Sequence, residues 1–343
     1  MLHGHGDDLY ACHGDITANF SSNVISGFDH DGLRCHLASC WHQLAHYPEP
    51  DAATAEAELA AWLRVRADEV LLTRGATDAI YLVAQMARGR KALIFEPTFA
   101  EYGDACRLHG VQVKACFEGM GHLEHPDSHP LPDLVWLCNP NNPTGAVIPK
   151  AALTELVDSH PATLFVVDQS YGAFTLEPLF TPREAARRTN LLLIHSMTKQ
   201  FAVPGLRLGY LTACPSLVAR LRAERQPWAV GTLAIEAARY LVRHADSYVF
   251  DLPYLLKERA RVSEALTRMG GIETSPSQTH FLLCRLRMGN AAALKEHLAT
   301  HHGLLIRDAS NFLGLTPGHF RIAVQGREAD DRLIRAIGEW LWE

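Results

Sequence analysis

The sequence predicts an α/β protein with a mostly parallel β-sheet covered by helices on both faces, joined to a smaller α+β domain. Short, continuous apolar runs alternate with helical stretches along the first two thirds of the chain. Strands of a parallel sheet have this pattern because both of their faces are buried. After about residue 235 the alternation ends, and a long helical stretch precedes two further strand-like runs. The change of pattern separates a larger from a smaller unit.

The composition is that of a globular protein with about two domains. The chain has 343 residues, of which 48% are hydrophobic and 20% charged, and its formal net charge is −6. The negative charge and the lack of a long Lys or Arg run argue against a nucleic-acid or anionic-membrane partner. No segment has the pattern of a membrane-spanning helix or a signal peptide, so we expect a cytoplasmic protein.

We expect three regions along the chain. Residues 1–45 are rich in Gly, His, Ser and Asp, which predicts an irregular arm that contributes to the small domain and to the functional site. Residues 46–235 would form the large domain. Residues 236–343 would form the small domain, with strands near 279–286 and 320–324 and a closing helix.

Local patterns predict the elements of the large domain. Ala and Leu recur at helical spacing over residues 54–66. A strand at 70–72 is followed by a glycine turn and a helix over 78–88. Four further apolar runs predict strands, at 92–95, 134–138, 164–167 and 191–194. Since ligands of such sheets gather beyond the carboxyl ends of the strands, the polar residues after each run are the candidate site.

These polar residues suit pyridoxal phosphate. Asp168 closes a strand, Tyr171 follows three residues later, and Lys199 lies in a hydroxyl-rich turn. The cofactor needs an amine for a Schiff base and a carboxylate that keeps its ring nitrogen protonated. The helix start after Gly75 offers free backbone N–H groups to a phosphate. Each residue alone has an ordinary structural explanation, whereas the ordered set indicates the cofactor.

Three motifs carry a family resemblance: Asn-Pro-Asn-Asn-Pro-Thr-Gly at 139–145, Asp168-x-x-Tyr171, and Ser-Met-Thr-Lys through Pro-Gly-Leu-Arg-Leu-Gly over 196–209. In these motifs the sequence resembles the fold type I, class I/II aminotransferases, over nearly its whole length. The resemblance implies a seven-stranded, mostly parallel sheet and pyridoxal 5′-phosphate as cofactor. It also implies a homodimer with the cofactor near the subunit boundary.

The resemblance implies a role for each motif residue. Lys199 would form the Schiff base, and Asp168 would pair with the pyridine nitrogen. Tyr171, the third catalytic residue, and Asn142 would donate to the ring oxygen, and Tyr102 would stack on the ring. The cofactor phosphate would be held by Ala76, Thr77, Ser196 and Arg207, and by Tyr47 of the partner subunit.

Two subgroups of this family fit the chain: threonine-phosphate decarboxylase of cobalamin biosynthesis and histidinol-phosphate aminotransferase. Four segments resemble the decarboxylase more closely, at residues 5–6, 20–23, 99–102 and 227–230. The resemblance implies substrate contacts from His5, Gly6, Asn23, Asn142, Arg307 and Arg321. The hypothesis is therefore decarboxylation of O-phospho-L-threonine to (R)-1-amino-2-propanol phosphate.

Two alternatives stay open. The first is transamination of histidinol phosphate with 2-oxoglutarate as acceptor. The second is a pyridoxal-phosphate-dependent regulator or a catalytically silent scaffold, which we do not expect because no DNA-binding module precedes the large domain. Gln169, His195 and Arg74 depart from the family pattern and leave the charge of the substrate pocket open.

We predict neither a disulfide framework nor a metal site. The eight cysteines are scattered, and none forms a C-x-x-C pair, which indicates buried free thiols. His42 and His46 have the i, i+4 spacing of two ligands on one helix face. A structural zinc site needs a further ligand cluster at matching spacing, and the sequence offers none.

Overall fold

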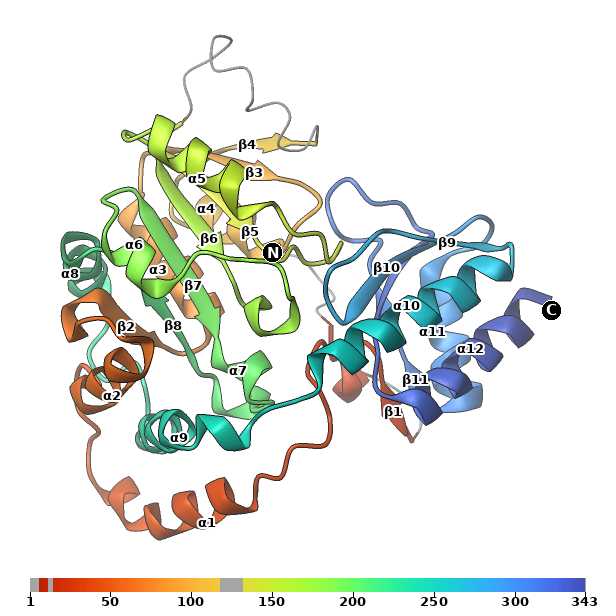
Figure 1. The fold of residues 1–343 in the computed structure, drawn as a ribbon, viewed down its shortest axis with the longest axis horizontal. Coiled ribbons are helices and arrows are strands. Elements are labelled where there is room, and N and C mark those ends of the chain that lie inside the picture. The colour runs from red at the N-terminus through yellow and green to blue at the C-terminus, as the bar shows by residue number, and fades with distance from the viewer. Residues whose placement is uncertain (1–5, 12–14, 118–131, 343) are drawn as a thin grey trace.

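The computed structural model describes residues 6–11, 15–117 and 132–342, so the predicted site residue His5 lies outside the described residues. Figure 1 shows two α/β bodies side by side, one around a seven-stranded sheet and one around a four-stranded sheet. None of the helices in the described ranges is long and apolar enough to cross a lipid bilayer.

The large sheet confirms the predicted fold class. Its strand order is β2-β8-β7-β6-β5-β3-β4, and only the pairs that involve β8 are antiparallel. The seven strands are β2 (Val70–Thr73), β3 (Lys91–Phe95), β4 (Gln112–Cys116), β5 (Leu134–Cys138), β6 (Leu164–Asp168), β7 (Leu191–Ser196) and β8 (Gly209–Thr212). The sequence did not predict β4 and β8. Three of the five β4 residues are exposed on this edge strand, so it lacks a continuous apolar run.

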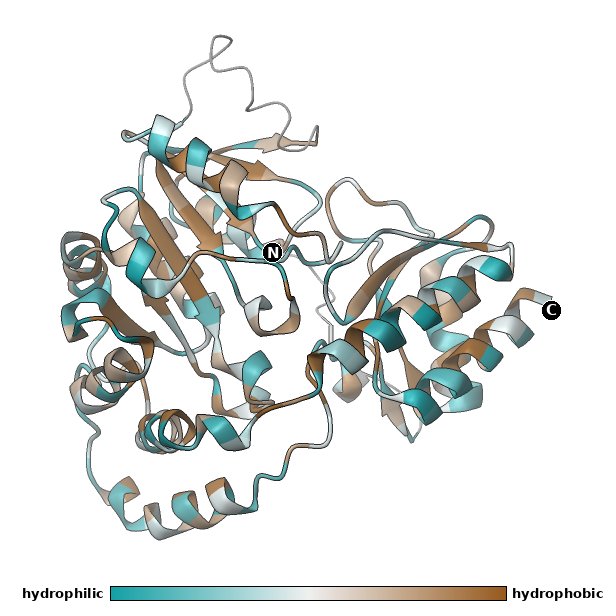
Figure 2. Ribbon diagram, viewed as in Figure 1, coloured by the Kyte–Doolittle hydropathy of each residue, from teal (hydrophilic) through white to brown (hydrophobic). Residues whose placement is uncertain are grey.

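Helices cover both faces of this sheet, which explains the apolar strands. In β5, Trp136 packs in one buried cluster, while Val135 and Leu137 pack in another on the opposite face. The first cluster includes α3 (Ala76–Met86), α4 (Glu101–Leu108) and α8 (Pro215–Glu224). The second includes α5 (Lys150–Ser159) and α6 (Pro182–Ala186). Figure 2 shows the strands as a hydrophobic layer between helices with hydrophilic outer faces.

The helical stretch predicted after residue 235 is two helices. Helix α9 (Thr232–Arg243) packs with α2 (Ala53–Leu63), and α10 (Leu252–Arg268) packs in the core of the smaller body. The side chain of Asp251 caps α10 by accepting a hydrogen bond from the backbone N–H of Tyr254. The predicted domain boundary at 235/236 falls inside α9, and the domain limits stay a prediction.

The smaller body is an antiparallel sheet covered by helices, with strand order β12-β13-β10-β9. Its strands are β9 (Ile272–Thr274), β10 (Phe281–Leu286), β12 (Arg307–Asp308) and β13 (His319–Ala323). Besides α10, its helices are α11 (Ala291–His302) and α12 (Arg327–Trp342). The strands predicted near 279–286 and 320–324 and the closing helix are therefore present.

The amino-terminal region is more ordered than expected, because it contains helix α1 (Asp31–Ser39) and the 3-10 helix η2 (Trp41–Ala45). Before α1, strand β1 (Ala18–Asn19) pairs in parallel with β11 (Leu304–Leu305). Phe20 is fully buried in the core of the smaller body, and its backbone carbonyl accepts from Ala323. Residues 18–20 are thus part of the smaller body, which is otherwise formed by the last third of the chain.

The turn at residues 139–145, which follows β5 of the large body, is in contact with the smaller body. Gly145 has φ +73°, and a Cβ there would lie 2.1 Å from the hydroxyl oxygen of Ser277. Its carbonyl accepts a hydrogen bond from the backbone N–H of Gln278 at 2.8 Å. Only glycine allows this approach, which sets Asn142 beside the smaller body.

Candidate active site

A cavity of about 310 Å³ opens where β5, β6 and β7 end, between the two bodies and the amino-terminal region. Its size is in the range of small-molecule sites. The cavity is lined by predicted site residues from all three parts of the chain, namely Gly6, Asn23, Ala76, Thr77, Tyr102, Asn142, Asp168, Tyr171, Ser196, Lys199, Arg207, Arg307 and Arg321. Tyr47 does not line the cavity. It is 86% exposed and packs on Trp228 with ring centroids 5.4 Å apart.

One wall of the cavity is suited to a phosphate, and we call Ala76, Thr77, Ser196 and Arg207 the phosphate cup. The first N–H groups of helix α3 have no partner within the helix and attract anions. Gly75 precedes α3 with φ +83°, and a Cβ there would lie 2.9 Å from Arg207 Nη2. Glycine therefore lets the guanidinium lie directly against the helix start.

Asp168 is buried at the end of β6, with 3% of its surface exposed. One carboxylate oxygen accepts from the Tyr102 hydroxyl and the other from the backbone N–H of Ser170, both at 2.8 Å. Burial raises the pKa of Asp168, and these hydrogen bonds oppose the rise. Because neither donor is charged, a protonated ring nitrogen is the kind of partner that would favour the ionised carboxylate.

Tyr102 has two contacts that its predicted stacking role did not anticipate. Its hydroxyl donates to Asp168, and its ring stacks on Trp136 with centroids 5.1 Å apart and planes at 15°. Trp136 takes one face of the ring, and stacking of a cofactor on the other face stays a prediction.

Lys199 lies in the short helix α7 (Met197–Gln200), directly after β7. Burial and the charges of Arg321 and Arg207 together lower the pKa of Lys199 to about 8, and the charge of Asp7 opposes this shift. A lysine with an ordinary pKa is almost wholly protonated at neutral pH, and only the neutral amine is a nucleophile. The lowered pKa therefore increases the fraction of Lys199 that is neutral and can attack a carbonyl carbon.

We expect covalent attachment of pyridoxal phosphate to the apoprotein to follow the titration of Lys199. With a pKa of about 8, the neutral fraction is about one tenth at pH 7, about half at pH 8 and nearly complete at pH 10. The rate should rise about fivefold from pH 7 to 8 and level off above pH 9. Stopped-flow absorbance, with borohydride trapping and mass spectrometry, measures this rate. A tenfold rise per pH unit continuing through pH 10 would contradict the lowered pKa.

Two arginines of the smaller body reach the cavity from neighbouring strands. Arg307 on β12 lies directly opposite Arg321 on β13, and both are buried. Arg321 donates to the side-chain oxygen of Asn142 and, at 2.7 Å, to the carbonyl of Ser21. Burial, together with the charge of Arg307, lowers the pKa of Arg321 to about 10, against an opposing effect of Tyr171. Two adjacent buried cations favour an anionic ligand.

Asn23 has a buried side chain in the cavity wall. Within the described residues, its amide nitrogen and oxygen make no hydrogen bond of normal geometry, although the amide lies beside the Tyr171 hydroxyl. Leaving such groups unpaired costs about 1–3 kcal/mol each. A bound molecule with both donors and acceptors would satisfy this amide.

The cavity also has lining residues that the sequence analysis missed. Asp7 has φ 64°, and its backbone N–H donates to the hydroxyl of Ser21 at 3.0 Å. Asn311 accepts from Arg307 at 2.8 Å, and Arg307 lies over the ring of Phe312 at 5.4 Å. These residues belong to no local motif. Asn311 lies four residues after Arg307, and this proximity to a predicted site residue is the only signal that could have found it.

The three departures from the family pattern add no charge to the cavity. Arg74 pairs with Asp78 at 3.1 Å on the surface. His195 stacks on Tyr210 with centroids 4.7 Å apart, and burial lowers its pKa to about 4, so it is neutral. None of Arg74, His195 and Gln169 is among the residues that line the cavity. Its charged residues are Lys199 and three arginines against Asp7 and Asp168, which favours an anionic ligand.

The fold and the cavity together define a pyridoxal-phosphate enzyme, because a poised lysine, a buried carboxylate and a phosphate cup meet at the ends of parallel strands. The chain belongs to the aminotransferase class I and II family, whose model matches residues 19–337. Pyridoxal 5′-phosphate is its cofactor. The family resemblance, the fold and the cofactor predicted from the sequence are thereby confirmed.

Relatives of both subgroups match the chain. The solved L-threonine-O-3-phosphate decarboxylase from Porphyromonas gingivalis is 38% identical with a TM-score of 0.91, and the match covers 95% of this chain and 100% of that chain. A threonine-phosphate decarboxylase from Salmonella typhimurium (strain LT2) is 29% identical, over 86% of this chain and 83% of that protein. A histidinol-phosphate aminotransferase from Mycobacterium sp. (strain JLS) is 28% identical, over 86% and 80%.

Proposed function

We propose that this protein decarboxylates O-phospho-L-threonine to (R)-1-amino-2-propanol phosphate, a building block for cobalamin. The paired Arg307 and Arg321 carry the proposal. The substrate has two anionic groups, a carboxylate and a phosphate, and the planar donor fork of arginine suits both. The similarity to the Porphyromonas gingivalis decarboxylase supports it further.

Residues from the amino-terminal region complete the proposed substrate site. Gly6 and Asn23 line the cavity, and a Cβ at Gly6 would lie 3.3 Å from Arg307 Cδ and 3.4 Å from Arg321 Nη2. In this proposal Asn23 and the two arginines orient the substrate, while Gly6 leaves room beside the guanidinium groups. His5 stays a proposed substrate contact.

The reaction depends on residues that select which bond at Cα breaks. When bound, pyridoxal phosphate would supply a conjugated ring that accepts the electron pair released at Cα as carbon dioxide leaves. Asp168 would pair with the ring nitrogen and keep it protonated, and Asn142 and Tyr171 would donate to the ring oxygen. The two arginines would hold the anionic groups of the substrate and so orient its carboxylate for release. Lys199 would supply the proton that replaces the carboxylate at Cα.

A homodimer is part of this proposal. Tyr47 would reach the phosphate cup of the partner subunit, which agrees with its place outside the cavity of its own chain. Tyr47 and Trp228 form an exposed aromatic pair, 86% and 49% exposed. Burial of such a pair at an interface would contribute to association.

Substrate incubation tests the proposal. With O-phospho-L-threonine, the holoenzyme should release one carbon dioxide per aminopropanol phosphate formed and produce no keto acid. With histidinol phosphate and 2-oxoglutarate, it should form no glutamate. Isotope-labelled substrate and mass spectrometry measure all these products. Glutamate formation without decarboxylation would favour histidinol-phosphate transamination instead, and turnover of neither substrate would reject both functions.

A further inference from the structure

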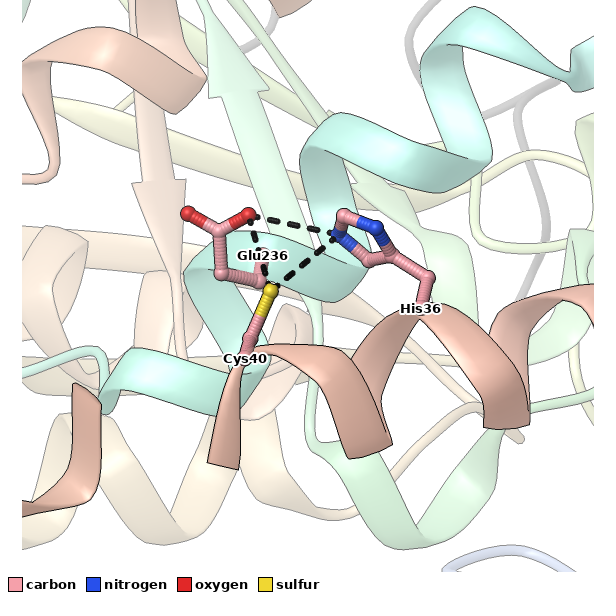
Figure 3. Close-up of side chains that lie close together, drawn as sticks. All are labelled: His36, Cys40 and Glu236. Atoms are coloured by element: carbon pink, nitrogen blue, oxygen red, sulfur yellow. Dashed lines mark hydrogen bonds and ion pairs between the residues drawn. The ribbon is translucent and has the colours of Figure 1, made fainter. Parts of the chain in front are cut away.

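A second cluster of reactive side chains lies outside the active site, where helix α1 packs on helix α9. His36 and Cys40 come from α1 and its carboxyl-terminal cap, and Glu236 comes from α9. Figure 3 shows the three side chains pointing toward one another. Within the described residues, one atom from each lies within 4.8 Å of the other two. We call this group the His–Cys–Glu cluster.

The spacing of the three atoms resembles a tetrahedral ligand set. His36 Nε2 lies 3.3 Å from Glu236 Oε2, and Cys40 Sγ lies 3.9 Å from His36 Nε2 and 3.8 Å from Glu236 Oε2. Zinc bonds of about 2.0 Å to nitrogen and oxygen and about 2.3 Å to sulfur place tetrahedral ligands about 3.3–3.6 Å apart. An inward shift of the sulfur by a few tenths of an ångström therefore completes the geometry.

Neighbouring residues fix the orientation of two of these ligands. The second carboxylate oxygen of Glu236 accepts from Arg239 at 2.7 Å, which leaves Oε2 directed at the thiol and the imidazole. The His36 ring packs on Tyr240 with centroids 5.1 Å apart. A hydrogen bond to the outer oxygen of the carboxylate, like that from Arg239, is typical of metal sites, because it holds the donor atom in place before the ion binds.

We propose that the His–Cys–Glu cluster binds one divalent cation of the zinc class, with a water molecule as fourth ligand. A thiolate and an imidazole favour zinc over magnesium or calcium, which prefer oxygen ligands. On binding, the S–H bond of Cys40 breaks, its proton passes to solvent, and the sulfur bonds the metal. The imidazole binds through Nε2 and keeps its proton on Nδ1. No electron is transferred.

The bound ion would fasten the amino-terminal region to the large body. Cys40 is the C-cap residue of α1 and directly precedes η2, which leads to Tyr47. Glu236 belongs to α9, which packs with α2 in the core around β2 and β8. The site is structural in this proposal, and its failure would leave the proposed decarboxylation untouched.

Metal titration of the full-length holoprotein tests the site. After chelator treatment and dialysis, zinc is added in competition with a chromophoric chelator, and bound metal is counted by elemental analysis. We expect one zinc per chain. Cobalt in place of zinc should give the intense visible bands of a tetrahedral thiolate site. Cys40→Ser and Glu236→Gln should each lose the bound zinc, and Cys40→Ser should abolish the cobalt bands.

Cys35→Ser is the matched control, since Cys35 is an exposed thiol on the same helix. It should keep both the zinc and the cobalt bands, as should His42→Ala in the neighbouring η2. Circular dichroism and cofactor content show that each variant is folded. The proposal is overturned if the wild type binds no zinc at equimolar metal, or if Cys40→Ser binds it as well as Cys35→Ser does.

Discussion

Replacement of Lys199 by alanine should lower kcat by about 10⁴-fold, the upper end of the range for a positioned acid–base group. The variant loses the buried amine whose pKa is lowered to about 8, and with it the proposed covalent bond to the cofactor. The absorption band of the lysine-bound cofactor should disappear as well. Steady-state assays and absorbance spectra of the purified variant measure both effects.

Lys150→Ala is the matched control, because Lys150 pairs with Glu184 at 2.8 Å, away from the cavity. It should keep the spectrum and the activity of the wild type. Persistence of the visible band in Lys199→Ala would mean that another lysine holds the cofactor.

Replacement of Asp168 by asparagine should lower kcat by about 10²–10³-fold, the range for loss of one preorganised electrostatic group. Asparagine has nearly the same shape and still accepts from Tyr102 or Ser170, but it cannot hold a proton on the ring nitrogen. The lysine-bound cofactor should form in this variant, with a shifted absorption maximum. Activity assays and spectra at several pH values measure the change.

Asp104→Asn distinguishes this effect from the loss of any buried carboxylate. Asp104 is 5% exposed and pairs with Arg107 at 2.6 Å on α4, and it does not line the cavity. We expect a loss of stability with little change in kcat. Wild-type kcat in Asp168→Asn would show that the cofactor nitrogen needs no anionic partner here.

Local patterns predicted most of the large sheet and the cavity residues that follow its strands, and the family resemblance supplied the other predicted cavity residues. The apolar runs that became β3, β5, β6 and β7 are buried on both faces, so each is visible in the sequence without its neighbours. Asp168 and Ser196 end such runs, and parallel strands bring their ends to one edge of the sheet. These residues could therefore be placed together from the sequence.

Features that depend on distant contacts could not be predicted. The Tyr102 hydroxyl reaches Asp168 across 66 residues, and Glu236 reaches Cys40 across 196 residues. Helical spacing indicates His42 and His46 as a pair on one helix face, whereas no spacing rule links Cys40 to Glu236 on a distant helix. Strand β4 was missed because its exposed edge breaks the apolar run.

The pairing of β1 with β11 has a consequence during translation. Ala18 pairs with Leu304, so the partner of the first strand leaves the ribosome 286 residues later. At about 5–20 residues per second, this delay is about 15 to 60 s. In that interval all four residues of the phosphate cup are synthesised, while the hydrophobic core that buries Phe20 is still incomplete. A chaperone that shields this early segment would therefore raise the yield of native enzyme.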